Sequence, residues 1–415
     1  MRRTATLLSL GVAQYLLMIS WFNLSAVLPI IYVDWDLTGS LAGVMLAAGE
    51  VGYLIGSMLM GYLTDRIGGF KTFTLGSIGA GLSGVAFALY AHNFASALIL
   101  RLLVGLGLSG TYIPGMKIVS DIYSHEKMGK VIGVYTASFT AGVSSSYYIT
   151  SVFASLYGWR GGIFWTSVWS LLAAAIACLS SRGYEARVVF KGWVGWGALM
   201  RNVLAKRSVW LISLGYMGHV WELQGMRSWL GPYLNASIRT LGHSAGEAFT
   251  LGNQVSSAIL IVGLVMPGIG GWLSDRVGRR RSIVFIATMS ILFSLTFGWM
   301  IRSPLYLLVA IGLAYSLAII ADSAIYKAGL IEIVKEEFTG VALGFQSLLG
   351  FMGSTLSVAF FGAILDLTNN PSDVAGLGYF PIWGWSYTTL GLVSLISPLS
   401  ALLLKREPKG VKLSS

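Results

Sequence analysis

Long apolar runs separated by short polar segments recur along the whole chain, and they constrain its fold more than any other feature. Runs of 18 or more apolar residues are typical of membrane-spanning helices, because a helix bonds every backbone group within its own segment. Only 11% of the 415 residues are charged, against about 25% in an average soluble domain. We therefore predict an all-α integral membrane protein.

Twelve such runs are present, six on each side of a long polar segment. They cover residues 6–31, 41–64, 71–91, 95–120, 130–156, 162–181, 208–234, 248–273, 282–301, 304–329, 339–366 and 381–404. We predict an N-terminal six-helix half over 1–181, a basic linker over 182–207, a C-terminal six-helix half over 208–404 and a tail over 405–415.

Lysine and arginine are distributed unevenly between the two sides of the predicted membrane. With both termini cytoplasmic, the cytoplasmic segments hold 22 of the 28 lysines and arginines, and the opposite loops hold only Arg160, Arg239 and Arg302. Basic residues concentrate in cytoplasmic loops, so we predict a plasma (inner) membrane protein with cytoplasmic linker and tail. The same bias accounts for the net charge of +11 without a nucleic-acid partner, for which no motif is present.

The two predicted halves share a repeated loop sequence. Residues 61–68 read Gly-Tyr-Leu-Thr-Asp-Arg-Ile-Gly, and residues 271–278 read Gly-Trp-Leu-Ser-Asp-Arg-Val-Gly. Each copy follows the second run of its half, which indicates a duplicated six-helix unit with pseudo-two-fold symmetry. The second copy continues with three arginines at 279–281, whereas the first continues with Gly-Phe-Lys at 69–71.

Twelve runs in two halves, a basic central segment and this paired loop resemble the major facilitator superfamily. The resemblance implies a secondary transporter that moves a small solute by alternating access, with a charge network across the two halves that closes the cytoplasmic side. On that basis we assign the cytoplasmic gate to Asp65, Arg66, Asp275 and Arg276. We expect a monomer with no cofactor, no metal and no enzymatic activity.

Ionisable and amide side chains inside the runs are the candidate substrate site. Arg101 lies in the fourth run and is followed by closely spaced glycines, similar to a motif of that family. The seventh run carries His219, Glu222, Gln224 and Arg227 near its middle. Charged groups at such depth are costly and face the bundle interior or a watery cavity. We predict that Arg101, His219, Gln224 and Arg227 bind substrate.

The acids within the runs are candidates for proton coupling. Burial favours the neutral form of a carboxyl group, so such an acid can bind and release H⁺ as its access to water changes. Glu222 is the first choice, followed by Asp322 of the tenth run and Glu50 of the second. For Glu222 the alternative is a buried structural ion pair. Asp322 could instead partner Lys117 or Arg227 or cap a broken helix, and Glu50 could pack against a neighbouring helix.

The arginines favour a proton-coupled organic-anion symporter, because a guanidinium binds a carboxylate through two hydrogen bonds. The alternative is a proton-coupled exporter of amphiphilic or cationic compounds, whose cavity would be lined by the many aromatic residues. Against it, the drug-antiporter pattern in the fifth run is broken: Gly133 and Gly142 fit, but Ser146-Tyr147 replaces Gly-Pro. A transport-inactive sensor on the same scaffold is a third reading, which the two intact loops disfavour.

Overall fold

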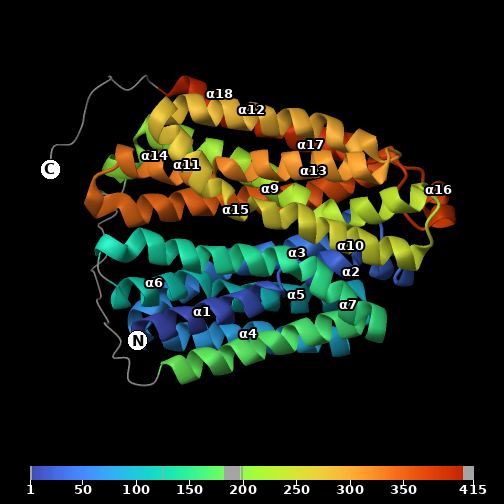
Figure 1. Cartoon of the computed structure of the whole chain (residues 1–415), viewed down its shortest axis with the longest axis horizontal. Coiled ribbons are helices and arrows are strands. Elements are labelled where there is room, and N and C mark those ends of the chain that lie inside the picture. The colour runs from blue at the N-terminus through green and yellow to red at the C-terminus, as the bar shows by residue number, and fades with distance from the viewer. Residues whose placement is uncertain (1, 124, 182–196, 198–199, 405–415) are drawn as a thin grey trace.

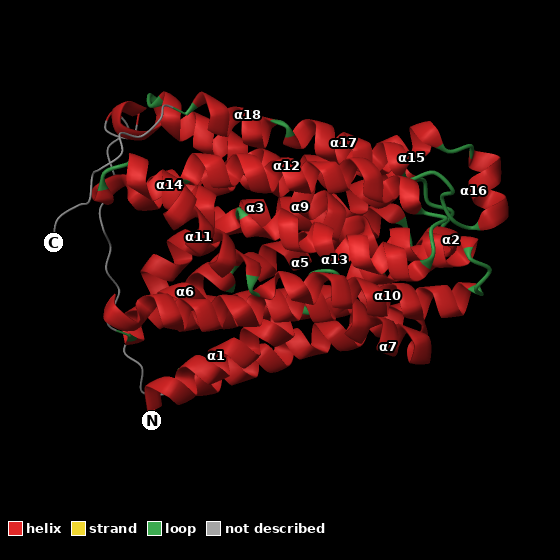
Figure 2. Cartoon of the chain, turned by 45° about the horizontal axis from the view of Figure 1, so that its top comes forward, coloured by secondary structure: helices red, strands yellow, loops and turns green. Residues whose placement is uncertain are grey.

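The computed structural model describes residues 2–123, 125–181, 197 and 200–404. Helices make up all the regular structure in these ranges (Figure 2). The predicted tail over 405–415 and most of the predicted linker over 182–207 lie outside the described residues.

The helices run side by side along the long axis of the molecule and form two groups (Figure 1). The first group comprises α1 (Arg2–Met18), α2 (Asn23–Asp34), α3 (Gly39–Ile67), α4 (Gly69–Tyr90), α5 (Phe94–Ser109), α6 (Tyr112–Ile122) and α7 (His125–Ser180). The second comprises α9 (Arg207–Thr240), α10 (Ala245–Ile261), α11 (Met266–Val277), α12 (Arg279–Phe297), α13 (Leu305–Ala321), α14 (Ser323–Ile333), α15 (Thr339–Thr368), α16 (Pro371–Leu377), α17 (Gly384–Ser394) and α18 (Ile396–Leu403).

Ten helical segments of the described chain are long and apolar enough to cross a membrane. One of them, Val131–Ser180, contains two predicted spans that meet at a kink, where Tyr157 and Gly158 leave the helical conformation. Helix α9 has 34 residues but carries Glu222 and Arg227, and it is not among the ten. With α9 and the second part of α7 added, the twelve predicted spans are accounted for. The prediction of an all-α membrane protein is confirmed.

Several runs predicted as continuous helices are broken in the structure. The run 6–31 divides into α1 and α2, and Ser146 of α7 bonds both sides of the break. Its Oγ donates to the carbonyl oxygen of Ile19 (2.5 Å) and accepts from the amide of Phe22 (3.2 Å). A broken membrane helix is tolerated when its freed backbone groups find such partners. The runs 95–120, 248–273, 304–329 and 381–404 are also broken.

The two ends of the helix bundle differ in character. We call the end at which α1 begins and α18 ends the basic end, on the left in Figure 1, because the loops after α3 and α11 with their arginines lie there. We call the other end, which carries α16, the opposite end.

The two groups are held together at the opposite end by α3 and α15. A Cβ on Gly362 would lie only 2.0 Å from the carbonyl oxygen of Gly39, so the two backbones are in direct contact. Asp366 of α15 accepts hydrogen bonds from the amides of Gly39 (2.6 Å) and Ser40 (2.7 Å) and from the Ser40 hydroxyl (2.5 Å). A carboxylate at a helix N-terminus binds free amides and complements the helix dipole.

Replacing Asp366 with alanine should open the contact between the groups at the opposite end. The variant loses three hydrogen bonds to a charged acceptor, and one such bond contributes about 1.5–3 kcal/mol. We expect the closed arrangement to lose roughly tenfold or more in population. Spin labels on Leu156→Cys and Tyr306→Cys, in a Cys178→Ser background, would measure it, because both side chains are exposed and lie in different groups.

Asp373→Ala is the control for this experiment. It removes an exposed carboxylate from the first turn of α16, at the same end of the molecule. A spin-label distance distribution that is unchanged in the Asp366 variant would contradict the assignment.

Candidate functional site

Arg101 of α5 is buried, and its guanidinium binds the break between α1 and α2. Nη2 donates to the carbonyl oxygen of Trp21 (2.6 Å), and Nη1 donates to Oδ1 of Asn23 (3.1 Å) and to the carbonyl oxygen of Ser20 (3.5 Å). The guanidinium therefore satisfies carbonyl groups that lack helical partners. Its Nε is buried without a hydrogen-bond partner.

A small cavity of about 20 Å³ lies beside this guanidinium. Its walls carry Arg101 and Glu50 among largely apolar surroundings. The other lining residues are Trp21, Leu46, Gly49, Val104, Gly105 and Leu108. One cation and one carboxyl group are thus presented to the same small space.

Glu50 of α3 is bound by two side chains of the second group. Gln224 of α9 donates from Nε2 to Oε1 of Glu50 (2.6 Å), and Ser354 of α15 donates from Oγ to Oε2 (3.0 Å). Glu50 is only 6% exposed. The structure therefore brings together two predicted site residues, Glu50 and Gln224, across the boundary between the groups.

His219 and Asp322 form a buried pair within the second group. Nδ1 of His219 lies 2.7 Å from Oδ1 of Asp322, and its Nε2 lies 2.7 Å from Oγ of Ser323. Asp322 stands at the break between α13 and α14. Its partner is thus His219, where Lys117 and Arg227 were the alternatives from sequence.

Glu222 lies three residues from His219 on α9 but contacts a different helix. Its Oε1 accepts a hydrogen bond from Oγ of Ser290 of α12 (2.7 Å), and the side chain is buried. The described polar contacts of both residues therefore remain within the second group.

Arg227 lies on the side of α9 that meets the first group. Its carbonyl oxygen accepts a hydrogen bond from the hydroxyl of Tyr147 of α7 (2.6 Å). Within the described ranges, its guanidinium makes no hydrogen bond or ion pair, and Nε is buried. Arg227 is half-buried, and a partly desolvated guanidinium without a partner is costly, so this position is suited to an anionic ligand.

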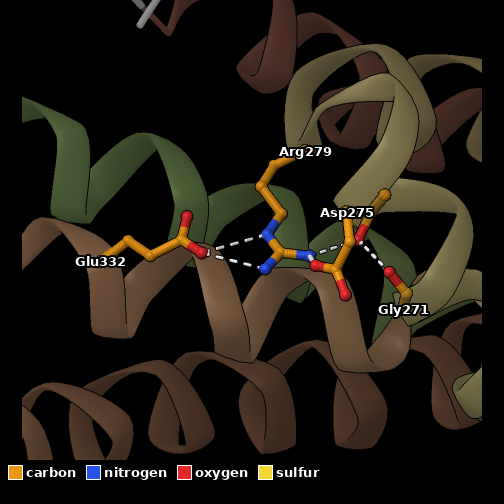
Figure 3. Close-up of polar contacts among 5 residues, drawn as sticks. Gly271, Asp275, Arg279 and Glu332 are labelled. Carbon is orange, nitrogen blue, oxygen red and sulfur yellow. Dashed lines mark hydrogen bonds and ion pairs between the residues drawn. The ribbon is translucent and has the colours of Figure 1, made fainter. Parts of the chain in front are cut away.

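The loop-motif acids form ion pairs at the basic end. Asp65 lies 2.8 Å from Nζ of Lys117 of α6. Asp275 lies 2.5 Å from Nη1 of Arg279, and Nη2 and Nε of Arg279 bind Oε1 of Glu332 of α14 at 2.9 and 3.2 Å (Figure 3). Each of these contacts stays within one group.

The arginines that follow the two acids contact aromatic rings. The guanidinium carbon of Arg66 lies 5.2 Å from the ring centre of Tyr62, and that of Arg276 lies 4.1 Å from that of Trp272. The resemblance implied a network that joins the two halves, whereas the ion pairs of Asp65 and Asp275 seen here join neighbours in one group. The gating role of these residues stays a prediction.

Asp275→Asn should disturb conformational switching more than Asp65→Asn. In the gating role, the second copy offers the arginines at 279–281 to the other group, whereas the first copy offers only Lys71. The ion pair of Asp65 with Lys117 is partly exposed. Isolated exposed pairs contribute about 0–1 kcal/mol. Counterflow rates in proteoliposomes should change several-fold for Asp275→Asn and less for Asp65→Asn. Equal or reversed effects would contradict this ranking.

Several partners in these clusters were not identified from the sequence. Ser354 is uncharged and has no distinctive neighbours, so nothing marked it as a partner of Glu50. Glu332 and Asp366 lie at or beyond the ends of apolar runs, where acids ordinarily face water. The position of Asp366 at the last residue of a run was the one available signal.

Membrane helices in two groups, with polar side chains meeting between them, are typical of membrane transport proteins. The family model of the Major Facilitator Superfamily matches residues 10–328 and 226–415. The chain belongs to this superfamily and is a secondary transporter, not an enzyme.

The relatives agree with this assignment. The chain is 25% identical over 365 residues to the "Probable L-galactonate transporter" of Escherichia coli (strain K12), covering 81% of this chain and 77% of that protein. It is 23% identical over 409 residues to the "Hexuronate transporter" of Bacillus subtilis (strain 168), covering 91% and 90%. A bacterial homolog of the human lysosomal transporter Spinster, solved in an inward-facing and occupied conformation, has a TM-score of 0.80 at 18% identity, covering 96% and 95%. That similarity confirms the fold.

Proposed function

We propose that the protein is a proton-coupled symporter of small organic anions. The observation that carries the choice of an anion is the guanidinium of Arg227, which is unpaired among the described residues. A site for cations would instead offer a free carboxylate, yet Glu50 and Glu222 each accept a hydrogen bond and Asp322 lies beside His219. The two relatives, named as transporters of L-galactonate and of hexuronate, support the same class of substrate.

The proposed substrate ligands come from both helix groups. Arg101 offers its unpartnered Nε from the first group, and Arg227 offers its guanidinium from the second. Gln224 and His219 complete the set on α9, and Glu222, Asp322 and Glu50 are the candidates for carrying the proton. A substrate carboxylate bound between two guanidinium groups would gain charge-assisted hydrogen bonds from each.

The proposed movement is that of two halves, 1–181 and 208–404, about this central region, in a monomer. The basic end would face the cytoplasm of a plasma (inner) membrane, because positively charged loops stay on that side. Opening at the opposite end would require the contact between Asp366 and Gly39 to separate, while the loops with Asp65, Arg66, Asp275 and Arg276 close the basic end.

The substrate class can be tested with purified protein. We expect aldonates and hexuronates to raise its melting temperature and tetraphenylphosphonium, a lipophilic cation, to leave it unchanged. In proteoliposomes, an inward proton gradient should drive accumulation of the same anions, and a protonophore should remove it. Stabilisation by the cation, with its expulsion on the same gradient, would overturn the proposal and favour the exporter. Ligand binding without accumulation would favour a sensor.

A further inference from the structure

We propose that Glu50 is the residue through which protonation controls the relative movement of the two helix groups. This inference rests on the proposed proton coupling and deepens it, because it selects one of three candidate acids. Depth in the membrane favoured Glu222 in the sequence, whereas the pattern of contacts in the structure favours Glu50.

A proton can shift the balance between two conformations only if its site has different surroundings in each of them. When two groups of helices move as units, contacts inside a group persist and contacts between groups change. A coupling acid should therefore have its polar partners in the other group.

Glu222 and Asp322 do not meet this requirement. Among the described residues, Glu222 is bound by Ser290 and Asp322 lies beside His219. All four residues belong to the second group. A movement of the groups as units would leave both contacts intact. Protonation of either acid would then act on both conformations alike.

Glu50 meets the requirement on both of its carboxylate oxygens. Gln224 and Ser354, from two helices of the second group, donate one hydrogen bond to each oxygen. The charged group facing Glu50 is Arg101 of α5, which lines the same cavity, and the nearest titratable neighbour on α3 is Tyr53. Helices α9 and α15 thus contribute neutral donors, and the first group contributes the charge.

The state of Glu50 then determines how firmly the groups are joined. An ionised carboxylate accepts both hydrogen bonds, and bonds to a charged acceptor are roughly twice as strong as neutral ones. A proton on Oε1 would face the amide nitrogen of Gln224, which has no lone pair to accept it. A proton on Oε2 would instead be donated to the Ser354 hydroxyl, and both hydrogen bonds would then be between neutral groups. Protonation therefore weakens the link, and closure at the opposite end favours release of the proton.

Spin labels on the two groups can test this coupling without any substrate. The chain's single cysteine, Cys178, is exposed on α7, and Val277 is exposed at the end of α11, so Val277→Cys gives a pair across the groups at the basic end. We expect the distance in nanodiscs to shorten as pH falls from 8 to 5. Glu50→Gln should hold the short distance at all pH values, and Glu50→Asp should retain the pH response.

Two serines of α15 provide a second variant and its matched control. Ser354→Ala removes one donor and leaves Glu50 in place, so the population at pH 8 should shift several-fold toward the short distance. Ser357 is equally buried, but its hydroxyl donates to the carbonyl oxygen of Trp221 within the second group. Ser357→Ala should therefore match the wild type.

A pH response that persists in Glu50→Gln, or an unchanged population in Ser354→Ala, would overturn the proposal. Loss of the response in Glu222→Gln but not in Glu50→Gln would overturn it in favour of Glu222. These measurements need no ligand, so their failure would leave the anion proposal standing. Conversely, a protein that binds no anion could still show a pH response that depends on Glu50.

Discussion

Replacing Arg227 with alanine should abolish the binding and uptake of organic anions while leaving a folded protein in the membrane. No side-chain hydrogen bond or ion pair of Arg227 is found in the described part of the chain, so the native structure loses little when the guanidinium is removed. A bound carboxylate, in contrast, would lose its charge-assisted partner. Truncating one member of a buried charge pair costs about 2–5 kcal/mol.

This cost corresponds to roughly a 30-fold or larger loss of affinity. Thermal-shift titration with a hexuronate would measure it, together with proteoliposome uptake. Arg227→Lys should fall between the wild type and Arg227→Ala, because lysine keeps the charge but not the two-bond geometry. Arg302→Ala is the control, since it removes the same charge from an exposed position at the opposite end. Unchanged uptake in Arg227→Ala would rule out the proposed anion site.

Replacing Arg101 with alanine should lower both uptake and stability, unlike the same change at Arg227. Arg101→Ala would also lose uptake, but it leaves the carbonyl groups of Ser20 and Trp21 without their donor. Unsatisfied buried groups cost about 1–3 kcal/mol each, so the melting temperature should fall as well. Reduced stability together with lost uptake separates Arg101 from Arg227.

Replacing Gly362 with alanine should prevent the two groups from closing at the opposite end. The added Cβ would lie 2.0 Å from the carbonyl oxygen of Gly39, whereas real Cβ contacts stay above 3.0 Å. The Cβ is fixed to the backbone of α15 and the oxygen belongs to the backbone of α3, so the two helices would have to separate. We expect at least a tenfold loss of uptake and a longer distance between labels at Leu156→Cys and Tyr306→Cys.

Gly344→Ala provides the matched control on the same helix. A Cβ there would meet no atom within 4 Å, and alanine is the better helix former by about 1 kcal/mol. This variant should transport normally and be slightly more stable. Normal uptake in Gly362→Ala would show that the close contact of α3 and α15 is dispensable.

The class of fold could be predicted because it depends on composition along the chain. A run of apolar residues with few charges can satisfy its backbone in a bilayer only as a helix, and the paired loops at 61–68 and 271–278 indicated the duplication. The breaks within the membrane helices could not be predicted from composition. The break at residues 19–22 is stabilised by Ser146 and Arg101, which lie more than 75 residues away in sequence.

Buried polar side chains could be picked out from the sequence, but their pairings could not. Depth in the apolar runs identified Glu50, Glu222 and Arg227 as unusual, because ionisable groups there are costly whatever surrounds them. It could not show that Glu50 is bound by Gln224 and that Glu222 is bound within its own group.

The sequence by itself determined the membrane class, the number of spans and the set of residues that carry unusual chemistry, since these depend on local hydropathy and on a repeated motif. Tertiary structure alone decided which of these residues are joined across the two groups and which remain within one. The physical reason is that a hydrogen bond such as the one between Glu50 and Ser354 links residues 304 positions apart. Such a bond depends on how α3 and α15 pack, and close packing there requires Gly39 and Gly362.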